Sequence, residues 1–294
     1  MAETPAPESP SPVPAAGDAA PESLVVNAVL DLAGRATLPY QEGRAERNFG
    51  TAFWYNDLVD TTMPGREVIR QYLVTAEPLT RHALGQWTLR SGLSEPEQTA
   101  GVLMMPDFAQ KWIRLPDLGI AVMPTVDLHR HAEAKRWSWT TEEITEGLAA
   151  RDADIAAIGT DPLPAYLLGH GVGPAAPEDP AEDEDDAGEA GEAGEAKKSR
   201  DVRPQAVVPG TVVRDADGSI RWHGPLPAGY AGAPVFAGLP LGDEQFNLVC
   251  AGLVLPGEAP YTVATFDRIR PAVRALAPTN DLRRRHWWQR SRKS

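Results

Sequence analysis

Short apolar runs, separated by turn residues, make up most of the first half of the chain. Stretches rich in turn formers lie between the runs, for example at 63–65 and 95–97. Runs of this length, bounded by turns, are typical of the strands of an all-β sandwich or barrel. The sequence therefore predicts a first β domain, with apolar runs at 24–32, 50–55, 68–75, 101–105, 112–115 and 118–123.

A second β region begins at residue 165. Its apolar runs lie at 165–171, 205–213, 219–222, 246–255 and 261–265, and the Asp- and Gly-containing stretch 215–218 predicts a turn. After the last run, Ile269, Val273 and Leu276 recur at helical spacing. This spacing predicts a C-terminal helix over residues 266–276.

The segment that joins the two β regions has a helical pattern instead. Thr140 and Glu143 fit a capping box, in which a threonine at the N-cap is followed three residues later by a glutamate. Ile144, Leu148 and Ile155 follow at spacings that suit a helix. We therefore expect an inter-domain helix that begins at Thr140.

Three further segments stand out by composition. Residues 1–23 are mostly Pro, Ala, Ser and Glu, and residues 174–200 contain ten acidic side chains. Neither segment can bury enough apolar surface to offset chain entropy, so both are predicted to be disordered. Residues 283–294 form a basic tail with two tryptophans. The acidic segment is a spacer or a docking site for a basic partner, and the tail is able to pair with it.

Length and charge limit the possible classes of protein. The chain has 294 residues, enough for two small β domains, and a formal net charge of −13, which disfavours general nucleic-acid binding. We expect a disordered segment at 1–23, a first β-barrel at 24–128 and a connecting segment at 129–164. A second barrel at 165–282 contains a disordered insertion at 174–204, and the tail follows at 283–294.

Targeting signals and cysteine content favour a soluble, cytoplasmic protein. The N-terminal segment has neither a basic start nor an apolar stretch, and no run approaches the roughly 20 apolar residues that cross a bilayer. Cys250 is the single cysteine, so no intrachain disulfide can form. Because Cys250 lies in an apolar strand, we expect a small buried hydrophobic residue rather than a nucleophile.

The candidate chemistry centres on a Gly-rich loop at 228–234 that leads into an apolar strand. Such a loop presents one small residue at the mouth of a cleft. The loop resembles the one that carries the nucleophile in trypsin-like serine proteases, whose pattern is Gly-x-Ser-Gly-x-Pro. Gly229, Gly232 and Pro234 match this pattern, and Ala231 occupies the serine position. A methyl group cannot attack a carbonyl carbon.

Three upstream segments resemble the same family in the expected order. Residues 50–54 are similar to its Gly-Thr-Gly-Phe strand. Residues 72–78 are similar to its Leu-Val-Thr-Ala-Ala-His strand, with Pro78 at the histidine position. Residues 116–124 are similar to its Asp-Ile-Ala-Val-x-Pro strand, with Gly119 at the aspartate position. Strand geometry would place Asp117 on the same face but about 6.6 Å away, too far to hold an imidazole.

The resemblance implies a fold and a function for the chain. Its fold would be two antiparallel six-stranded Greek-key β-barrels with a cleft between them. Because Ser, His and Asp act as a unit, their absence implies a pseudoprotease that uses no cofactor or metal. The backbone N–H groups around Gly229, Tyr230 and Ala231 would still form an oxyanion hole able to hold a peptide carbonyl or carboxylate. We therefore expect a scaffold or regulatory module that binds a protein or peptide.

Two other functions remain open at the level of sequence. The chain could be a working serine-type hydrolase with a displaced catalytic constellation, for which the loop histidine His82 is a candidate base. It could also bind nucleic acid or an anionic surface through its basic tail. His129, His131 and Glu133 form a possible metal cluster, but their polar surroundings favour a solvated linker.

Overall fold

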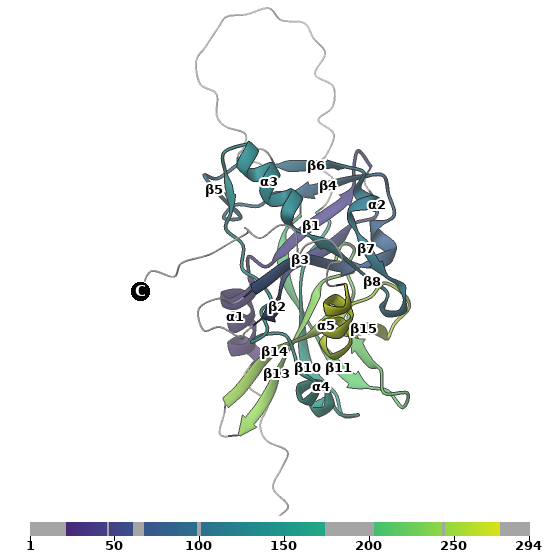
Figure 1. The fold of residues 1–294 in the computed structure, drawn as a ribbon. Helices are drawn as coiled ribbons and strands as arrows, with labels where there is room; N and C mark the ends of the chain where they lie inside the picture. Colours follow the sequence, from purple (N-terminus) through teal and green to yellow (C-terminus); the bar gives the residue numbers. More distant parts are fainter. Residues whose placement is uncertain are drawn as a thin grey trace, which may run out of the picture.

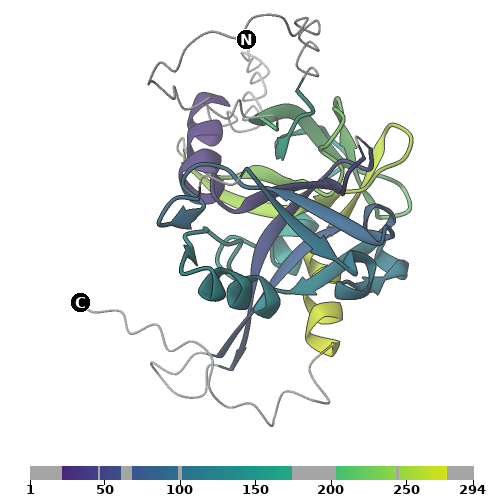
Figure 2. The ribbon, with the colours of Figure 1, turned by 90° about the horizontal axis from the view of Figure 1, so that it is seen from above.

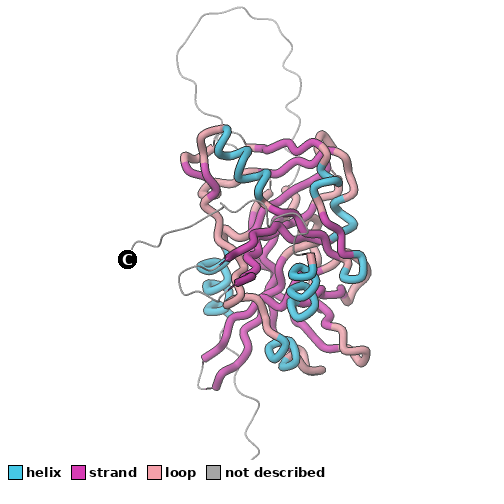
Figure 3. Tube along the Cα trace, viewed as in Figure 1, coloured by secondary structure: helices cyan, strands magenta, loops and turns pink. Residues whose placement is uncertain are grey.

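The computed structural model describes residues 22–45, 47–60, 68–98, 101–173, 203–242 and 245–276. Strands dominate these residues, and helices lie only at their periphery (Figure 3). The strands form two large antiparallel sheets, one in the upper and one in the lower half of the view in Figure 1. The chain is therefore all-β, as predicted. Residues 1–21, most of the acidic insertion (174–202) and the basic tail (283–294) lie outside the described residues, so the predictions for them stay predictions.

The first sheet has seven strands in the order β6-β4-β1-β2-β3-β8-β7. Among the described residues its edge strands β6 and β7 do not pair with each other, so this sheet differs from the predicted six-stranded barrel. The short strands β5 (Ser94–Glu95) and β9 (Ser138–Trp139) form a separate ribbon. The sheet consists of β1 (Thr37–Glu42), β2 (Gly50–Asp60), β3 (Val68–Ala76), β4 (Leu84–Thr88), β6 (Val102–Pro106), β7 (Ile113–Leu115) and β8 (Ile120–Pro124).

Aromatic side chains fill the core of the first sheet. The ring of Tyr40 lies 5.2 Å from that of Trp87 and 5.6 Å from that of Phe108. Gly85 makes room for Phe108, because a Cβ atom at this position would lie 2.1 Å from the ring. The 4-residue helix α2 (Phe108–Lys111) begins with this phenylalanine and closes one end of the core.

The second sheet is a closed barrel of six antiparallel strands, which confirms the prediction for this half of the chain. Its order is β10-β11-β12-β15-β14-β13. Apolar side chains such as Trp222 and Val235 are fully buried inside it. Its strands are β10 (Leu163–His170), β11 (Gln205–Arg214), β12 (Ile220–His223), β13 (Pro234–Gly242), β14 (Gln245–Val254) and β15 (Tyr261–Thr265).

A helix replaces the first predicted strand. Residues 24–32 belong to α1 (Glu22–Ala33), whose buried residues Val25, Val29 and Ala33 follow at four-residue intervals on one face. This face packs against β13 and β14 of the barrel (Figure 2). The prediction of a strand was wrong because a run of apolar residues without alternation also suits a buried helix face.

The connecting segment is helical at other positions than predicted. The prediction of a helix that begins with a capping box at Thr140 was wrong, because the backbone of Ile144 instead forms hydrogen bonds with Trp54 and Asn56 of β2. The helices are α3 (Val126–Ala134) and α4 (Asp152–Ala157), and the Asp154 carboxylate accepts the backbone N–H of Arg151 at 2.8 Å. A strand bridge to β2 therefore outweighed the local helix signal.

A third core joins the two sheets. It contains buried residues of both, such as Phe53 from β2 and Phe236 from β13, and it is closed by α5 (Phe266–Ala275). Helix α5 confirms the predicted C-terminal helix, with Phe266, Ile269 and Val273 buried. The two sheets therefore share one continuous apolar interface. None of the helices in the described part of the chain has the length and apolar character needed to span a bilayer.

Candidate functional site

The Gly-rich loop lies directly against the first sheet. Gly229 and Gly232 have φ of 91° and 86°, values that favour glycine. A Cβ atom on Gly232 would lie 2.2 Å from Thr75 Oγ1 and 2.5 Å from the carbonyl oxygen of Thr51. The second glycine of the motif is thus required both by backbone conformation and by close contact between the two sheets.

Thr51 anchors this loop to β2. Its backbone N–H donates to the carbonyl of Ala231 at 3.0 Å, and its hydroxyl donates to the carbonyl of Gly229 at 2.8 Å. The hydroxyl of Thr75 in turn donates to the carbonyl of Thr51 at 2.8 Å. The loop carbonyls therefore point into the interface and are held there by buried donors.

The three positions singled out by the sequence lie where the two sheets meet, and they are linked through contacts of their neighbours. Glu77, the neighbour of Pro78, donates its backbone N–H to the carbonyl of Gly119 at 2.9 Å. A Cβ atom on Gly119 would lie 2.9 Å from the Leu255 side chain. The carbonyl of the preceding residue, Val254, accepts the N–H of Gly232, which is the neighbour of Ala231. Pro78 is exposed, and Gly119 and Ala231 are half-buried.

The three side chains at these positions are not those of a serine protease triad. Pro78, Gly119 and Ala231 offer a ring, a hydrogen atom and a methyl group. Asp117 does not lie on an alternating strand as expected, because residues 116–118 form a 3₁₀ turn that ends at Gly119 with φ of 69°. Its side chain is no substitute for a carboxylate at Gly119.

The nearest carboxylate beside Pro78 is already engaged. Glu77 is 5% exposed, and its carboxylate forms ion pairs with Arg81 at 2.8 Å and with Arg114 at 3.5 Å. One carboxylate therefore faces two exposed guanidinium groups at the edge of the site.

Two backbone N–H groups of the loop, one on the buried Gly229 and one on the half-buried Ala231, stand apart from the others. The N–H groups of Tyr230, Gly232 and Ala233 donate to backbone carbonyls. Within the ranges that the structure describes, the N–H groups of Gly229 and Ala231 have no hydrogen-bond acceptor. These are the donors that the sequence motif assigned to an oxyanion hole. The Tyr230 side chain turns away into the barrel, where its hydroxyl donates to the carbonyl of Ala206 at 3.2 Å, so it does not line the site.

A buried histidine, which the sequence analysis did not single out, lies behind the loop. His170 is fully buried; its Nδ1 lies 3.3 Å from the carbonyl oxygen of Arg203 and its Nε2 lies 2.9 Å from Thr37 Oγ1. Because a carbonyl only accepts, Nδ1 carries the proton and Nε2 accepts the Thr37 hydroxyl. Gln205 donates to the same hydroxyl oxygen at 2.7 Å. Burial lowers the pKa of His170 well below its ordinary value, so the ring is neutral.

Arg203 is the second residue that sequence reasoning missed. Its side chain is 1% exposed and donates to four backbone carbonyls, those of Tyr40, Gly50, His170 and Gly171. Burial lowers the pKa of Arg203 to about 10, so the guanidinium stays charged at neutral pH. It forms no ion pair with a carboxylate in the described residues.

Arg203 also fixes the two ends of the acidic insertion. Gly171 donates its backbone N–H to Pro204 at 3.0 Å and accepts the Arg203 side chain at 2.9 Å. His170 and Gln205 are paired at the adjoining ends of β10 and β11. The chain therefore leaves and rejoins the barrel at neighbouring points. No pattern in the sequence marks these contacts, since they join residues far apart along the chain.

The other histidines singled out by sequence lie elsewhere. His82 stacks on Phe108 at 4.6 Å between ring centroids, and its buried Nε2 has no partner in the described part of the chain. Burial lowers the pKa of His82, and no hydroxyl or thiol contacts its ring nitrogens among the described residues. It lacks the nucleophile that a displaced catalytic base would serve.

The segment with His129, His131 and Glu133, for which a solvated linker was expected, is part of a helix. His129 lies on α3, where its Nε2 is 2.7 Å from Gln71 Oε1, and His131 and Glu133 are exposed on the same helix. Over the described ranges, no three His, Cys, Asp or Glu side chains are grouped to hold a metal ion. Cys250 is fully buried, as predicted, and burial raises the pKa of its thiol.

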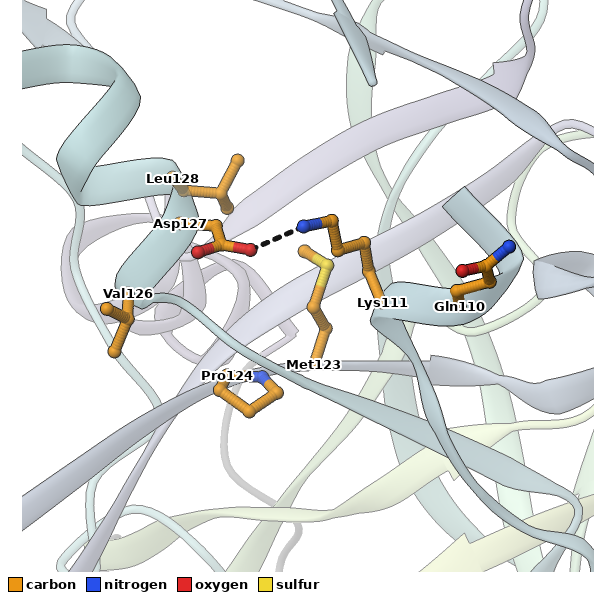
Figure 4. A pocket seen from close by; sticks show the side chains of 7 residues that line it. All are labelled: Gln110, Lys111, Met123, Pro124, Val126, Asp127 and Leu128. Atoms are coloured by element: carbon orange, nitrogen blue, oxygen red, sulfur yellow. Dashed lines mark hydrogen bonds and ion pairs between the residues drawn. The ribbon is translucent and has the colours of Figure 1, made fainter. Parts of the chain in front are cut away.

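A shallow pocket lies at the far end of β8 from Gly119 (Figure 4). Its volume is about 210 Å³, and an ion pair between Lys111 and Asp127, with a distance of 2.6 Å, crosses it. Both charged groups are thus already paired. It is lined by Gln110, Lys111, Met123, Pro124, Val126, Asp127 and Leu128.

Comparisons with known proteins return serine proteases among solved structures. No family model matches the chain, and no curated protein sequence matches it. The thermostable serine protease AL20 from an extremophilic microorganism is 12% identical over 83% of this chain and 96% of its own, with a TM-score of 0.37. Rv3671c from M. tuberculosis H37Rv, in the inactive form of a Ser-to-Ala mutant, is 11% identical over 90% and 98%, with a TM-score of 0.38.

A further similar structure is the HtrA-type protease AlgW with a tripeptide. It is 13% identical over 86% of this chain, and this chain spans 62% of its length, with a TM-score of 0.39. Likeness at this level assigns neither a family nor an activity.

Proposed function

We propose that the chain is a trypsin-like serine protease homologue that lacks the Ser-His-Asp triad and binds a peptide or a protein segment at the seam between its two sheets. The observation that carries the proposal is that Pro78, Gly119 and Ala231 stand where the family has its triad, beside the N–H groups of Gly229 and Ala231, which have no acceptor in the described part of the chain. The chemistry is lost from the side chains, but the backbone that would hold a carbonyl is kept. Such a module would act as a scaffold or regulator.

Two features support binding rather than hydrolysis. The donors belong to Gly229 and Ala231, whose loop is fixed by Thr51 and by the contact of Gly232 with Thr75. A donor that is already held in place costs little to order when a ligand binds. Removing the serine or histidine of subtilisin lowers turnover about 10⁶-fold, so a homologue without either would show no useful hydrolysis.

A selection experiment tests the binding role. The folded full chain is immobilised and incubated with a random hexapeptide pool that contains equal amounts of free acids and C-terminal amides. We expect retained peptides that then bind in solution by fluorescence anisotropy. Ala231→Trp, which fills the space above the loop, should abolish this binding, while the exposed control Asp152→Asn should not. Failure to retain any peptide would overturn the proposal.

A second measurement addresses the alternative of a working hydrolase. A fluorophosphonate probe reacts with activated serines, and we expect no labelling of the folded chain. The same sample with Ala231→Ser should also stay unlabelled, because position 78 offers no base to activate the new hydroxyl. Specific labelling of a serine in the unaltered chain would instead favour a displaced catalytic constellation.

A further inference from the structure

The loop at the seam lies directly over a buried positive charge. A Cβ atom on Gly229 would lie 2.7 Å from Nη2 of Arg203 and 2.3 Å from the carbonyl oxygen of His170. The guanidinium therefore lies immediately behind the residue whose N–H group is free. Only glycine fits here, because any side chain would displace the arginine.

The charge of Arg203 is not neutralised by protein carboxylates in the described residues. Its four hydrogen bonds all go to backbone carbonyls, which carry partial rather than full negative charge. Nearby His170 is neutral, so it neither repels nor balances the guanidinium. A buried ion normally has a counter-ion, because removing a charge from water is costly.

Charged side chains also lie beside Pro78, at the edge of the first sheet. Arg81 and Arg114 both face the single carboxylate of Glu77, and Asp117 adds one exposed carboxylate on the adjoining turn. These two guanidinium groups balance the two carboxylates, so this edge is not acidic, unlike the chain as a whole, whose net charge is −13.

From these contacts we infer that the site takes an anionic group, the terminal carboxylate of a peptide, on the N–H groups of Gly229 and Ala231, with Arg203 as its buried counter-charge. The inference rests on the proposed function and names the ligand class. The two oxygens of the peptide carboxylate would each accept one of these two N–H groups. Hydrogen bonds to a charged acceptor are about twice as strong as those to a neutral one, so a free acid should be preferred to an amide.

The test uses peptides from the selection, resynthesised with either a free carboxylate or a C-terminal amide. We expect the acid to bind the full chain about tenfold more tightly than the amide, measured by fluorescence anisotropy at about 0.15 M salt. Equal affinity would overturn the carboxylate site and leave peptide binding intact. Retention of no peptide at all would overturn both proposals, so the two failures are distinguishable.

Matched variants locate the preference. Ala231→Asp places a negative charge at the half-buried loop position, whereas Ala231→Asn has nearly the same shape without the charge. The acid-to-amide ratio should fall to about one in the Asp variant and persist in the Asn variant. An equal ratio in the two variants would contradict an anion at this loop.

Substitution of the buried cation tests its role directly. Arg203→Gln should abolish the acid preference, and Arg203→Lys, which keeps the charge, should retain it. A retained preference in a folded Gln variant would overturn the role of Arg203. If the Gln variant does not fold, as judged by its thermal transition, the pair of variants at Ala231 still decides whether an anion binds.

Discussion

Acidification should destabilise the chain through one buried histidine. His170 is fully buried and holds a single tautomer, with Nδ1 donating to Arg203 and Nε2 accepting from Thr37. A proton on Nε2 would break the bond to Thr37 and place a second cation beside the Arg203 guanidinium. The folded chain therefore resists protonation, and the pKa of His170 is held well below its ordinary value, chiefly by burial.

The size of the effect follows from proton linkage. In the unfolded chain the histidine has a pKa of about 6.5 and takes up a proton below that pH, whereas the folded chain does not. Stability that is present above pH 6.5 is therefore lost as the pH falls towards the folded-state pKa. Between pH 7.5 and pH 5.5 the loss amounts to about 1.3 kcal/mol in the free energy of unfolding for this one group.

The assay compares the unaltered chain with His170→Gln, which does not titrate. Urea titrations followed by tryptophan fluorescence at constant ionic strength give the free energy of unfolding at pH 7.5, 6.5 and 5.5. We expect the unaltered chain to lose about 1.3 kcal/mol more than the variant over this range. His82, whose pKa burial also lowers, is present in both chains and cancels from the difference. Parallel pH profiles for the two chains would refute the assignment of a neutral, buried His170.

Three further changes test other contacts. Arg274→Ala removes the 3.1 Å partner of the fully buried Asp57 carboxylate, and we expect a loss of about 1–3 kcal/mol in the free energy of unfolding in urea. Gly232→Ala forces a Cβ atom to 2.2 Å from Thr75 Oγ1 at φ of 86°, so it should cost at least about 2 kcal/mol, and an unchanged melting temperature would contradict the loop contact. Cys250 should resist alkylation in the folded chain, because burial raises the pKa of its thiol; equally fast alkylation in buffer and in urea would contradict its burial.

Most of the fold was predictable from local pattern. Most strands of both sheets follow apolar runs bounded by turns, and the closing helix α5 follows the spacing of Ile269 and Val273. The strands β1 and β4 were not among the predicted runs. Two segments were misread for reasons outside the local pattern. Residues 24–32 form a helix because their apolar face packs on β13 and β14, and the signal at Thr140 was overridden by the bridge from Ile144 to β2.

The candidate site was predictable in part. Motif order suggested that Pro78, Gly119 and Ala231 belong to one site, and this stays a prediction. In the structure Glu77 is hydrogen bonded to Gly119, and Gly232 is hydrogen bonded to the residue before Leu255. His170 and Arg203 were not singled out, since they act through partners up to 163 residues away along the chain. A buried arginine carries no sequence signal, because the same residue on a surface looks identical in the sequence.

The hydrogen bonds that join Gly171 to Arg203 and Pro204 form a clamp at the base of the acidic insertion. This clamp makes the insertion a suitable position for engineered insertions. Because Gly171 is hydrogen bonded to both Arg203 and Pro204, we expect β10 and β11 to stay paired whatever sequence joins residues 173 and 203. A fluorescent domain or an affinity tag could be grafted there while the strands on either side keep their register. The same clamp would allow homologous proteins to have a longer or shorter insertion between these two strands without a change in the strand pairing of the barrel.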